Sequence, residues 1–159
     1  MVMNEALKSR PLEVLFWSIA FPGFGQFLNG KFLKGVVLLV LEFLINTRSN
    51  LNTIIILSFL GETEAAVAQT NYQWLMFYPC IYLFGIWDAY RDAGAGRESF
   101  SFFPFVFSAY LGTIGVIFSE NFTLFGILIG PIWLPILFLF IGVGIGLIIK
   151  RTLTKYKSN

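Results

Sequence analysis

Apolar residues gather in long stretches separated by short polar segments, and this pattern predicts an all-α fold. The stretches cover residues 12–28, 32–47, 74–90, 100–118 and 122–149. Several approach the roughly 20 residues that a helix needs to cross a hydrocarbon core about 30 Å thick. A shorter run at residues 54–60 cannot cross, so we expect it to pack on the bundle or to lie at the membrane surface. The pattern therefore predicts a polytopic helical membrane protein with a single integral membrane domain over residues 1–159.

Proline and glycine interrupt the first and the last stretch. Pro22 and Gly23 stand inside the first one, and Pro131 and Pro135 stand inside the last. Proline deprives a helix of one hydrogen-bond donor, and glycine adopts backbone conformations that other residues avoid. We therefore expect about four crossings plus a re-entrant or broken first segment. Residues 100–150 should form a C-terminal helical pair, with the last span beginning at Pro131.

The basic residues predict the orientation, because Lys and Arg accumulate on the cytoplasmic side of membrane proteins. The chain has a basic cluster at residues 150–157, whereas the polar segment 61–73 has no basic residue. With a re-entrant first segment, both termini are cytoplasmic, and so are all of the 11 Lys and Arg residues except Arg48. If the first segment crosses fully, the N-terminus lies outside instead. The charge distribution favours the re-entrant arrangement.

Composition narrows the range of functions. The 159 residues are 57% hydrophobic and 13% charged, and the formal net charge is only +2. So weak a positive charge is not typical of a nucleic-acid-binding protein. The chain has no histidine and one cysteine, which excludes Ser-His-Asp triads, His-ligated zinc or haem, and internal disulfides. We expect no catalytic residue, no cofactor and no metal site, and we interpret Cys80 as a small packing residue inside a span.

Glu42 is the one acidic residue well inside an apolar stretch. A charge at such depth costs at least about 2.5–3.5 kcal/mol and usually faces other helices or a cavity. One interpretation is a proton or cation site, and the other is a structural network with Asn46 and Arg48. Gln26 and Asn29 follow the break in the first stretch and are further candidate ligands, unless the break is a purely structural turn. The candidate polar site therefore comprises Glu42, Gln26, Asn29, Asn46 and Arg48.

A second polar group stands where the third stretch ends. Asp88, Arg91 and Asp92 have three- and four-residue spacings that place them on one helix face. Paired carboxylates can support hydrolysis or metal binding, but no third ligand or nucleophile accompanies them here. We therefore expect a structural network at the cytoplasmic boundary of the membrane.

Glycines four residues apart occur twice in the last stretch, as Gly126 with Gly130 and as Gly142 with Gly146. In a membrane helix this spacing places small residues on one face and lets another helix approach closely. The two pairs are therefore candidate helix-packing positions. They would serve either packing within the bundle or a homodimer contact.

Two motifs resemble bacterial relatives of the two-transmembrane-segment domain family. Residues 22–35 read Pro-Gly-Phe-Gly-Gln-Phe-Leu-Asn-Gly-Lys-Phe-Leu-Lys-Gly and resemble its Pro-Gly-x-Gly-Gln-x-Tyr-x-Gly-x-x-x-x-Gly signature, although Leu28 replaces the usual aromatic residue. Residues 87–93, Trp-Asp-Ala-Tyr-Arg-Asp-Ala, are similar to the Asp-Ala-Tyr-Arg ending of those proteins. Residues 71–79 look like a block in small membrane proteins of spore-forming Gram-positive bacteria. The resemblance covers residues 12–93 and implies insertion in the bacterial cytoplasmic membrane, but it transfers no activity or catalytic residue.

These features favour a non-enzymatic multi-pass protein that acts through partner binding or assembly in the cytoplasmic membrane. The expected partners are the lipid bilayer and either another membrane protein or a second copy of the chain. The alternative is a small carrier or channel component, because an acid near broken helices is typical of transport sites. An intramembrane enzyme has the least support, since the chain has few nucleophilic or acid–base groups to place within the membrane.

Overall fold

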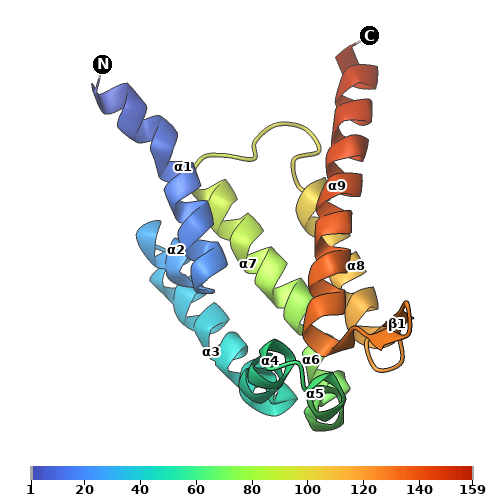
Figure 1. The fold of residues 1–159 in the computed structure, drawn as a ribbon. Coiled ribbons are helices and arrows are strands. Elements are labelled where there is room, and N and C mark those ends of the chain that lie inside the picture. Colours follow the sequence, from blue (N-terminus) through green and yellow to red (C-terminus); the bar gives the residue numbers. More distant parts are fainter. Residues whose placement is uncertain (1, 159) are drawn as a thin grey trace.

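The computed structural model describes residues 2–158, with side chains from residue 10 to residue 157, and these residues are mostly helical (Figure 1). The helices are α1 (Val2–Ala20), α2 (Phe24–Leu28), α3 (Phe32–Ser49), α4 (Leu51–Phe59), α5 (Thr63–Gln69), α6 (Tyr72–Leu75), α7 (Tyr78–Asp92), α8 (Phe103–Phe118) and α9 (Gly130–Ser158). A two-residue hairpin pairs β1 (Thr123–Leu124) with β2 (Ile127–Leu128) in antiparallel register. The all-α class predicted from the sequence is confirmed.

The longer helices run alternately in opposite directions (Figure 1). In that view α1 leads down to a turn, α2 turns back, α3 and α8 descend, and α7 and α9 rise. The N-terminus, the C-terminus and the loop between α7 and α8 therefore lie at one end of the molecule, and α4 and α5 lie at the other. We call these the terminal end and the α4–α5 end.

The predicted break in the first apolar stretch is present between α1 and α2. Gly23 has a φ of 92°, a left-handed conformation that suits glycine, and it lies directly before α2. At Gly25 a Cβ would lie 2.7 Å from the Cβ of Ala89, so α2 packs tightly against α7. The break is therefore a turn that returns the chain onto its neighbours.

A hydrophobic core lies at the α4–α5 end. Ile54 is fully buried there, and with Leu51 of the same helix it contacts a core that four other helices supply through Ala66, Leu75, Val116 and Ile132. The short apolar run at residues 54–60 forms most of α4 and its C-cap, and it packs on the bundle, which was one of the two expectations. Burial of apolar surface is the main favourable term that fixes α4 in this position.

The C-terminal helical pair is α8 with α9, and its seam contains two of the predicted glycines. A Cβ added at Gly142 would lie 2.5 Å from the Cα of Ser108, and one added at Gly146 would lie 2.5 Å from the Cα of Pro104. Ser108 Oγ also donates a hydrogen bond to the carbonyl oxygen of Leu139 at 3.0 Å. Gly142 and Gly146 thus allow close packing within the chain.

The prediction that Gly126 and Gly130 share one helix-packing face is wrong, although Gly130 alone does pack closely against Thr63 of α5. Residues 122–129 contain the hairpin, and Gly126, with a φ of 80°, has nothing within 4 Å of an added Cβ. Gly130 also has a φ of 80° and begins α9, where it faces Thr63 of α5. A left-handed conformation at both glycines favours a turn over a continuous helix.

Two further expectations need correction. Residues 74–90 do not form one helix, because α6 ends at Leu75 and α7 begins at Tyr78, with Pro79 in its first turn. Proline suits a helix start because it lacks the backbone N–H that would be unpaired there. Cys80 is exposed and lies 3.5 Å from Thr113 Oγ1, so it does not fill a buried space.

Among the described residues, one helix is both long and apolar enough to cross a membrane, at Gly130–Lys157. It contains Pro135 without ending there, so α9 is a single helix over its whole length. The Phe103–Phe118 helix is apolar but shorter. This finding is compatible with association with a membrane.

Replacing Gly142 by alanine should destabilise the α8–α9 seam, because the new methyl group would overlap backbone atoms of Phe107 and Ser108. We expect a loss of about 1–3 kcal/mol, measured as a lower melting temperature in mild detergent. Gly144 is the matched control, because a Cβ there has no neighbour within 4 Å. Gly144→Ala should be neutral or slightly stabilising, since alanine favours helix. Equal melting of both variants would contradict close packing at Gly142.

Candidate functional site

The residues of the predicted polar site do not lie together. Gln26 and Asn29 belong to a network at the terminal end, together with Asp88 and Asp92. Glu42 and Asn46 line a separate pocket. The sequence placed all of these residues in one candidate group because it could not show which helix faces meet.

The first cluster joins α2 to α7 through side-chain amides. Gln26 is 0% exposed, and its Nε2 donates to the carbonyl oxygen of Gly85 at 2.8 Å and to Asp88 Oδ2 at 3.2 Å. Asn29 Nδ2 donates to the carbonyl oxygen of Ala89 at 2.8 Å. The two family-like motifs are therefore in direct contact, although Gln26 and Asp88 are 62 residues apart. This geometry favours the structural interpretation of the break.

Lys34 of α3 completes this cluster, and the sequence analysis did not include it. Its Nζ lies 2.7 Å from Asp88 Oδ1 and 2.9 Å from Asp92 Oδ2. Each aspartate has an ammonium partner, which is the arrangement of a structural ion network. Arg91 instead lines an open pocket beside the α7–α8 loop, with Arg97 and Glu98. Nothing in the spacing of the sequence could assign Lys34 to residues more than 50 positions away.

A separate ion pair attaches the α7–α8 loop to α9. Lys150 Nζ lies 2.8 Å from Glu98 Oε2, and its hydrogen bond and charge lower the pKa of that exposed carboxyl. Lys157 Nζ lies 3.0 Å from Ser99 Oγ. Exposed pairs of this kind contribute little to stability, so their main effect is to position the loop.

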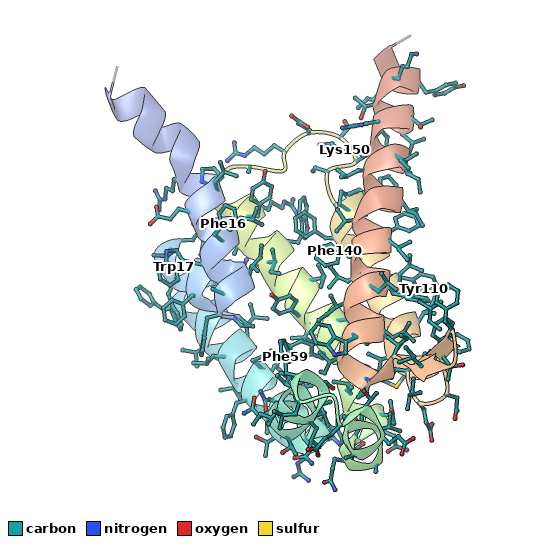
Figure 2. All side chains as sticks on the ribbon, in the orientation of Figure 1. Phe16, Trp17, Phe59, Tyr110, Phe140 and Lys150 are labelled. Atoms are coloured by element: carbon teal, nitrogen blue, oxygen red, sulfur yellow. The ribbon has the colours of Figure 1, made fainter. Side chains whose placement is uncertain are left out.

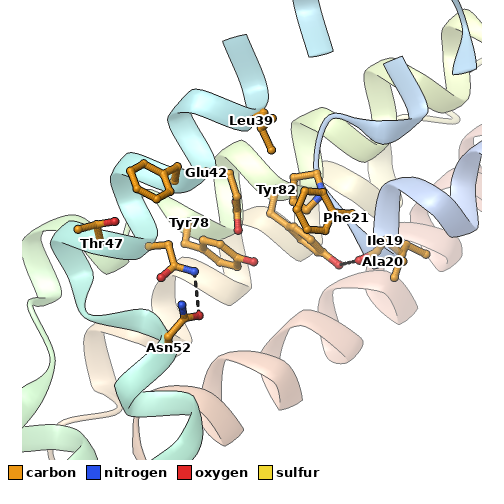
Figure 3. Close-up of a pocket in the computed structure, with 12 residues that line it drawn as sticks. Ile19, Ala20, Phe21, Leu39, Glu42, Thr47, Asn52, Tyr78 and Tyr82 are labelled. Carbon is orange, nitrogen blue, oxygen red and sulfur yellow. Dashed lines mark hydrogen bonds between the residues drawn. The ribbon is translucent and has the colours of Figure 1, made fainter. Parts of the chain in front are cut away.

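The second cluster is a pocket of about 370 Å³ between α1, α3, α4 and α7, shown in Figure 3. We call it the Glu42 pocket. Polar atoms come from the side chains of Glu42, Asn46, Thr47, Asn52, Tyr78 and Tyr82. The other lining residues are Ile19, Ala20, Phe21, Pro22, Leu39 and Phe43. Position 22 therefore does face the pocket, although Gln26 and Asn29 do not line it.

The carboxylate of Glu42 has few partners. Its Oε2 is buried and has no hydrogen-bond partner among the described residues, while the side chain interacts with that of Tyr78. None of the ion pairs among residues 10–157 involves Glu42. Arg48 lies over the ring of Trp74 at 5.9 Å, so the expected pairing of Glu42 with Arg48 is not formed. A half-buried carboxylate without an ion pair, in which one oxygen lacks a hydrogen-bond partner, is a candidate for ligand binding.

The neighbours of Glu42 are held in place by their own hydrogen bonds. Asn46 Nδ2 donates to Asn52 Oδ1 at 3.1 Å, and Tyr82 OH donates to the carbonyl oxygen of Ile19 at 2.7 Å (Figure 3). The rings of Tyr78 and Tyr82 stack with centroids 5.5 Å apart. These contacts give the pocket a defined wall on the α7 side.

An apolar groove of about 650 Å³ lies on the other side of the two tyrosines. Tyr78, Tyr82 and Ile19 line both the groove and the Glu42 pocket. The rest of the groove wall comes mainly from apolar residues of α7, α8 and α9 that include Leu83, Ile86, Val116, Ile132, Ile136, Leu139, Phe140 and Val143. Because so few polar groups line it, the groove suits an apolar occupant better than a polar one.

Comparison with family models, curated proteins and solved structures gives no match to this chain. The similarity of residues 12–93 to the two-transmembrane-segment family remains an expectation from the motifs. No group of three or more His, Cys, Asp or Glu side chains that could hold a metal ion occurs among the described residues. Proposals about function therefore rest on the geometry of the pocket and of the groove.

Replacing Gln26 by methionine should destabilise the protein. The change keeps the side-chain volume but removes the buried donor to the carbonyl oxygen of Gly85 and to the carboxylate of Asp88. We expect a loss of about 1–3 kcal/mol, measured by thermal melting in detergent. Gln73→Met is the control because Gln73 is exposed, and it should melt like the wild type. A Gln26→Met protein as stable as this control would mean that the α2–α7 amide contacts contribute nothing.

Proposed function

We propose that this chain is a multi-pass protein of the bacterial cytoplasmic membrane. Support comes from apolar side chains that face outward, such as Phe32, Leu33 and Val36 on α3. Trp17 and Tyr110 point away from the bundle in Figure 2. In the most apolar segment of 18 residues in α9, only 22% is buried inside the protein. A core helix of a soluble protein, by contrast, is mostly buried. Outward apolar surface of this extent is favourable in lipid and costly in water.

We further propose that α3, α7, α8 and α9 are the four crossings and that α1 with α2 is the re-entrant segment. The alternating directions of these helices support this assignment (Figure 1). Charged side chains also gather at the two ends, with Lys34, Asp88 and Lys150 at the terminal end and Glu62 and Glu64 at the other. The terminal end carries most of the basic residues, so it is assigned to the cytoplasm.

Cysteine labelling tests this topology in a Cys80→Ser background, which is needed because Cys80 is exposed. In intact cells an impermeant thiol reagent should label Glu64→Cys and Glu120→Cys and should miss Arg97→Cys and Lys155→Cys. Permeabilised cells should label all four, which controls for reactivity. The variant Glu5→Cys distinguishes a re-entrant first segment, which keeps position 5 inside, from a full crossing, which places it outside. Labelling of position 5 from outside would show a full fifth crossing.

For the activity, we propose that the protein is not an enzyme and acts by holding a transmembrane helix of another membrane protein in the apolar groove. The observation that carries this proposal is the groove itself, whose opposite walls are helices and whose lining is almost wholly apolar. α1 and α9 diverge toward the terminal end (Figure 1). A slot walled by helices suits a further helix, because helices pack at interaxial distances of about 8–10 Å.

The length of the groove fits a helix rather than a polar ligand. Along α9 the lining runs from Pro131 to Val143, which spans about 18 Å at 1.5 Å per residue, more than half of the hydrocarbon thickness of about 30 Å. Phe140 is 67% exposed at its edge and would be covered by an occupant. With few polar atoms in the lining, recognition would depend on shape, as it commonly does between membrane helices.

Site-specific photocrosslinking in native membranes tests the occupant. A benzophenone side chain at Phe140, in the groove, should give one adduct whose cross-linked peptide lies in an apolar helix of a different protein. The control is the same group at Phe84, which is 58% exposed but outside the groove, and it should give no such adduct. Adducts with a second copy of this chain, with lipid alone, or at both positions equally would contradict the proposal.

A small carrier or channel component is the second candidate function. The observation that favours it is the unpartnered Oε2 of Glu42 in a pocket beside the broken first segment. Discontinuous helices near an acid form the ion and substrate sites of many transporters. A chain with so few crossings would act as a carrier by assembling with further copies.

A further inference from the structure

The lining of the Glu42 pocket combines one acidic side chain with several aromatic side chains. Glu42 supplies the charge, and Phe21, Phe43, Tyr78 and Tyr82 supply the rings. The lining contains no Lys or Arg, so no side chain of the pocket neutralises the carboxylate. Its Oε2 is buried and lacks a hydrogen-bond partner among the described residues, so the protein leaves part of the carboxylate unsatisfied.

Because the lining has one acidic side chain and no basic one, we expect a ligand that carries one positive charge. A divalent metal ion is normally held by several oxygen ligands with more than one carboxylate, and Glu42 is the only acidic residue of the lining. A small hydrated ion such as Na⁺ gains nothing from the four aromatic side chains. The volume of about 370 Å³ also exceeds what one bare ion would fill.

The aromatic side chains specify an organic cation. Tyr78 and Tyr82 stack on each other at an interplanar angle of 15°. Phe21 and Phe43 also line the pocket. Quaternary and alkylated ammonium groups are attracted to such rings through their faces. Their methyl groups also suit apolar walls, while the positive charge pairs with the carboxylate.

We propose that the Glu42 pocket binds a monovalent alkylammonium cation, with Glu42 as its counter-charge and Phe43, Tyr78 and Tyr82 as its aromatic wall. The inference goes beyond partner binding in the groove and does not depend on it. It also requires only binding, so it holds whether or not the chain carries the cation across a membrane. Asn46 and Asn52 complete the polar side of the pocket.

The test uses purified protein in detergent and choline as the probe, with binding followed by calorimetry. The uncharged carbon isostere of choline, in which a tert-butyl group replaces trimethylammonium, has the same shape and separates charge from size. Choline should bind saturably, and the isostere should bind at least about tenfold more weakly because it lacks the charge. Glu42→Gln should lower choline affinity by a similar factor. Glu98→Gln is the matched control, because Glu98 is exposed at the terminal end and lies outside the pocket.

A second variant keeps the proposal testable if Glu42→Gln fails to fold. Phe43 is 70% exposed and lines the pocket, so Phe43→Ala should fold normally and lower choline affinity about threefold through the lost cation–π contact. The proposal is overturned if wild-type protein shows no saturable choline binding, if folded Glu42→Gln binds like wild type, or if the isostere binds equally. Displacement of choline by equimolar Na⁺ would also overturn it. Photocrosslinking at Phe140 is a separate measurement, so the two proposals fail independently.

Discussion

The hydrogen bonds from the side-chain amides of α2 to α7 are the contacts on which the rest of the structure depends. Gln26 and Asn29 donate to backbone oxygens of consecutive turns of α7, and Lys34 adds two ionic contacts beside them. In a bundle with so apolar an exterior, a polar group without a partner is costly. These bonds therefore fix where the broken first segment returns, and they orient α1, α3 and α7 relative to one another.

The two cavities follow from that attachment. Because α2 turns back onto α7, α1 remains on one side of α7 while the α8–α9 pair packs on the other (Figure 1). The apolar groove lies between these two sides, and the Glu42 pocket lies between α1, α3, α4 and α7. Tyr78 and Tyr82 line both, so they form the partition between a polar and an apolar space. One turn in the chain thus produces two cavities, one with a partly polar lining and one with an apolar lining.

Some features could be predicted from the sequence, and others depended on contacts between distant residues. Hydrophobic stretches located the helices, and Pro22 with Gly23 located the break, because both signals are local. The contact of Lys34 with Asp88 could not be predicted, since periodicity does not show which faces meet. Gly126 and Gly142 have the same motif and different structures. A positive φ at Gly126 belongs to a hairpin, and a motif of small residues does not distinguish a turn from a helix seam.

The separation of Glu42 from Arg48 has a helical cause that the sequence does contain. Six residues along an α-helix rotate the side chain by about 600°, which is a net rotation of about 240°. Four residues rotate it by about 400°, a net rotation of about 40°, which returns it near the starting face. Asn46 therefore shares the pocket with Glu42, and Arg48 points elsewhere and lies over Trp74. Glu42 and Arg48 are close in the sequence, which suggested an ion pair, but the helix turns their side chains to different faces. The carboxylate is left without a cation from its own helix, and the ligand site that we propose depends on this property.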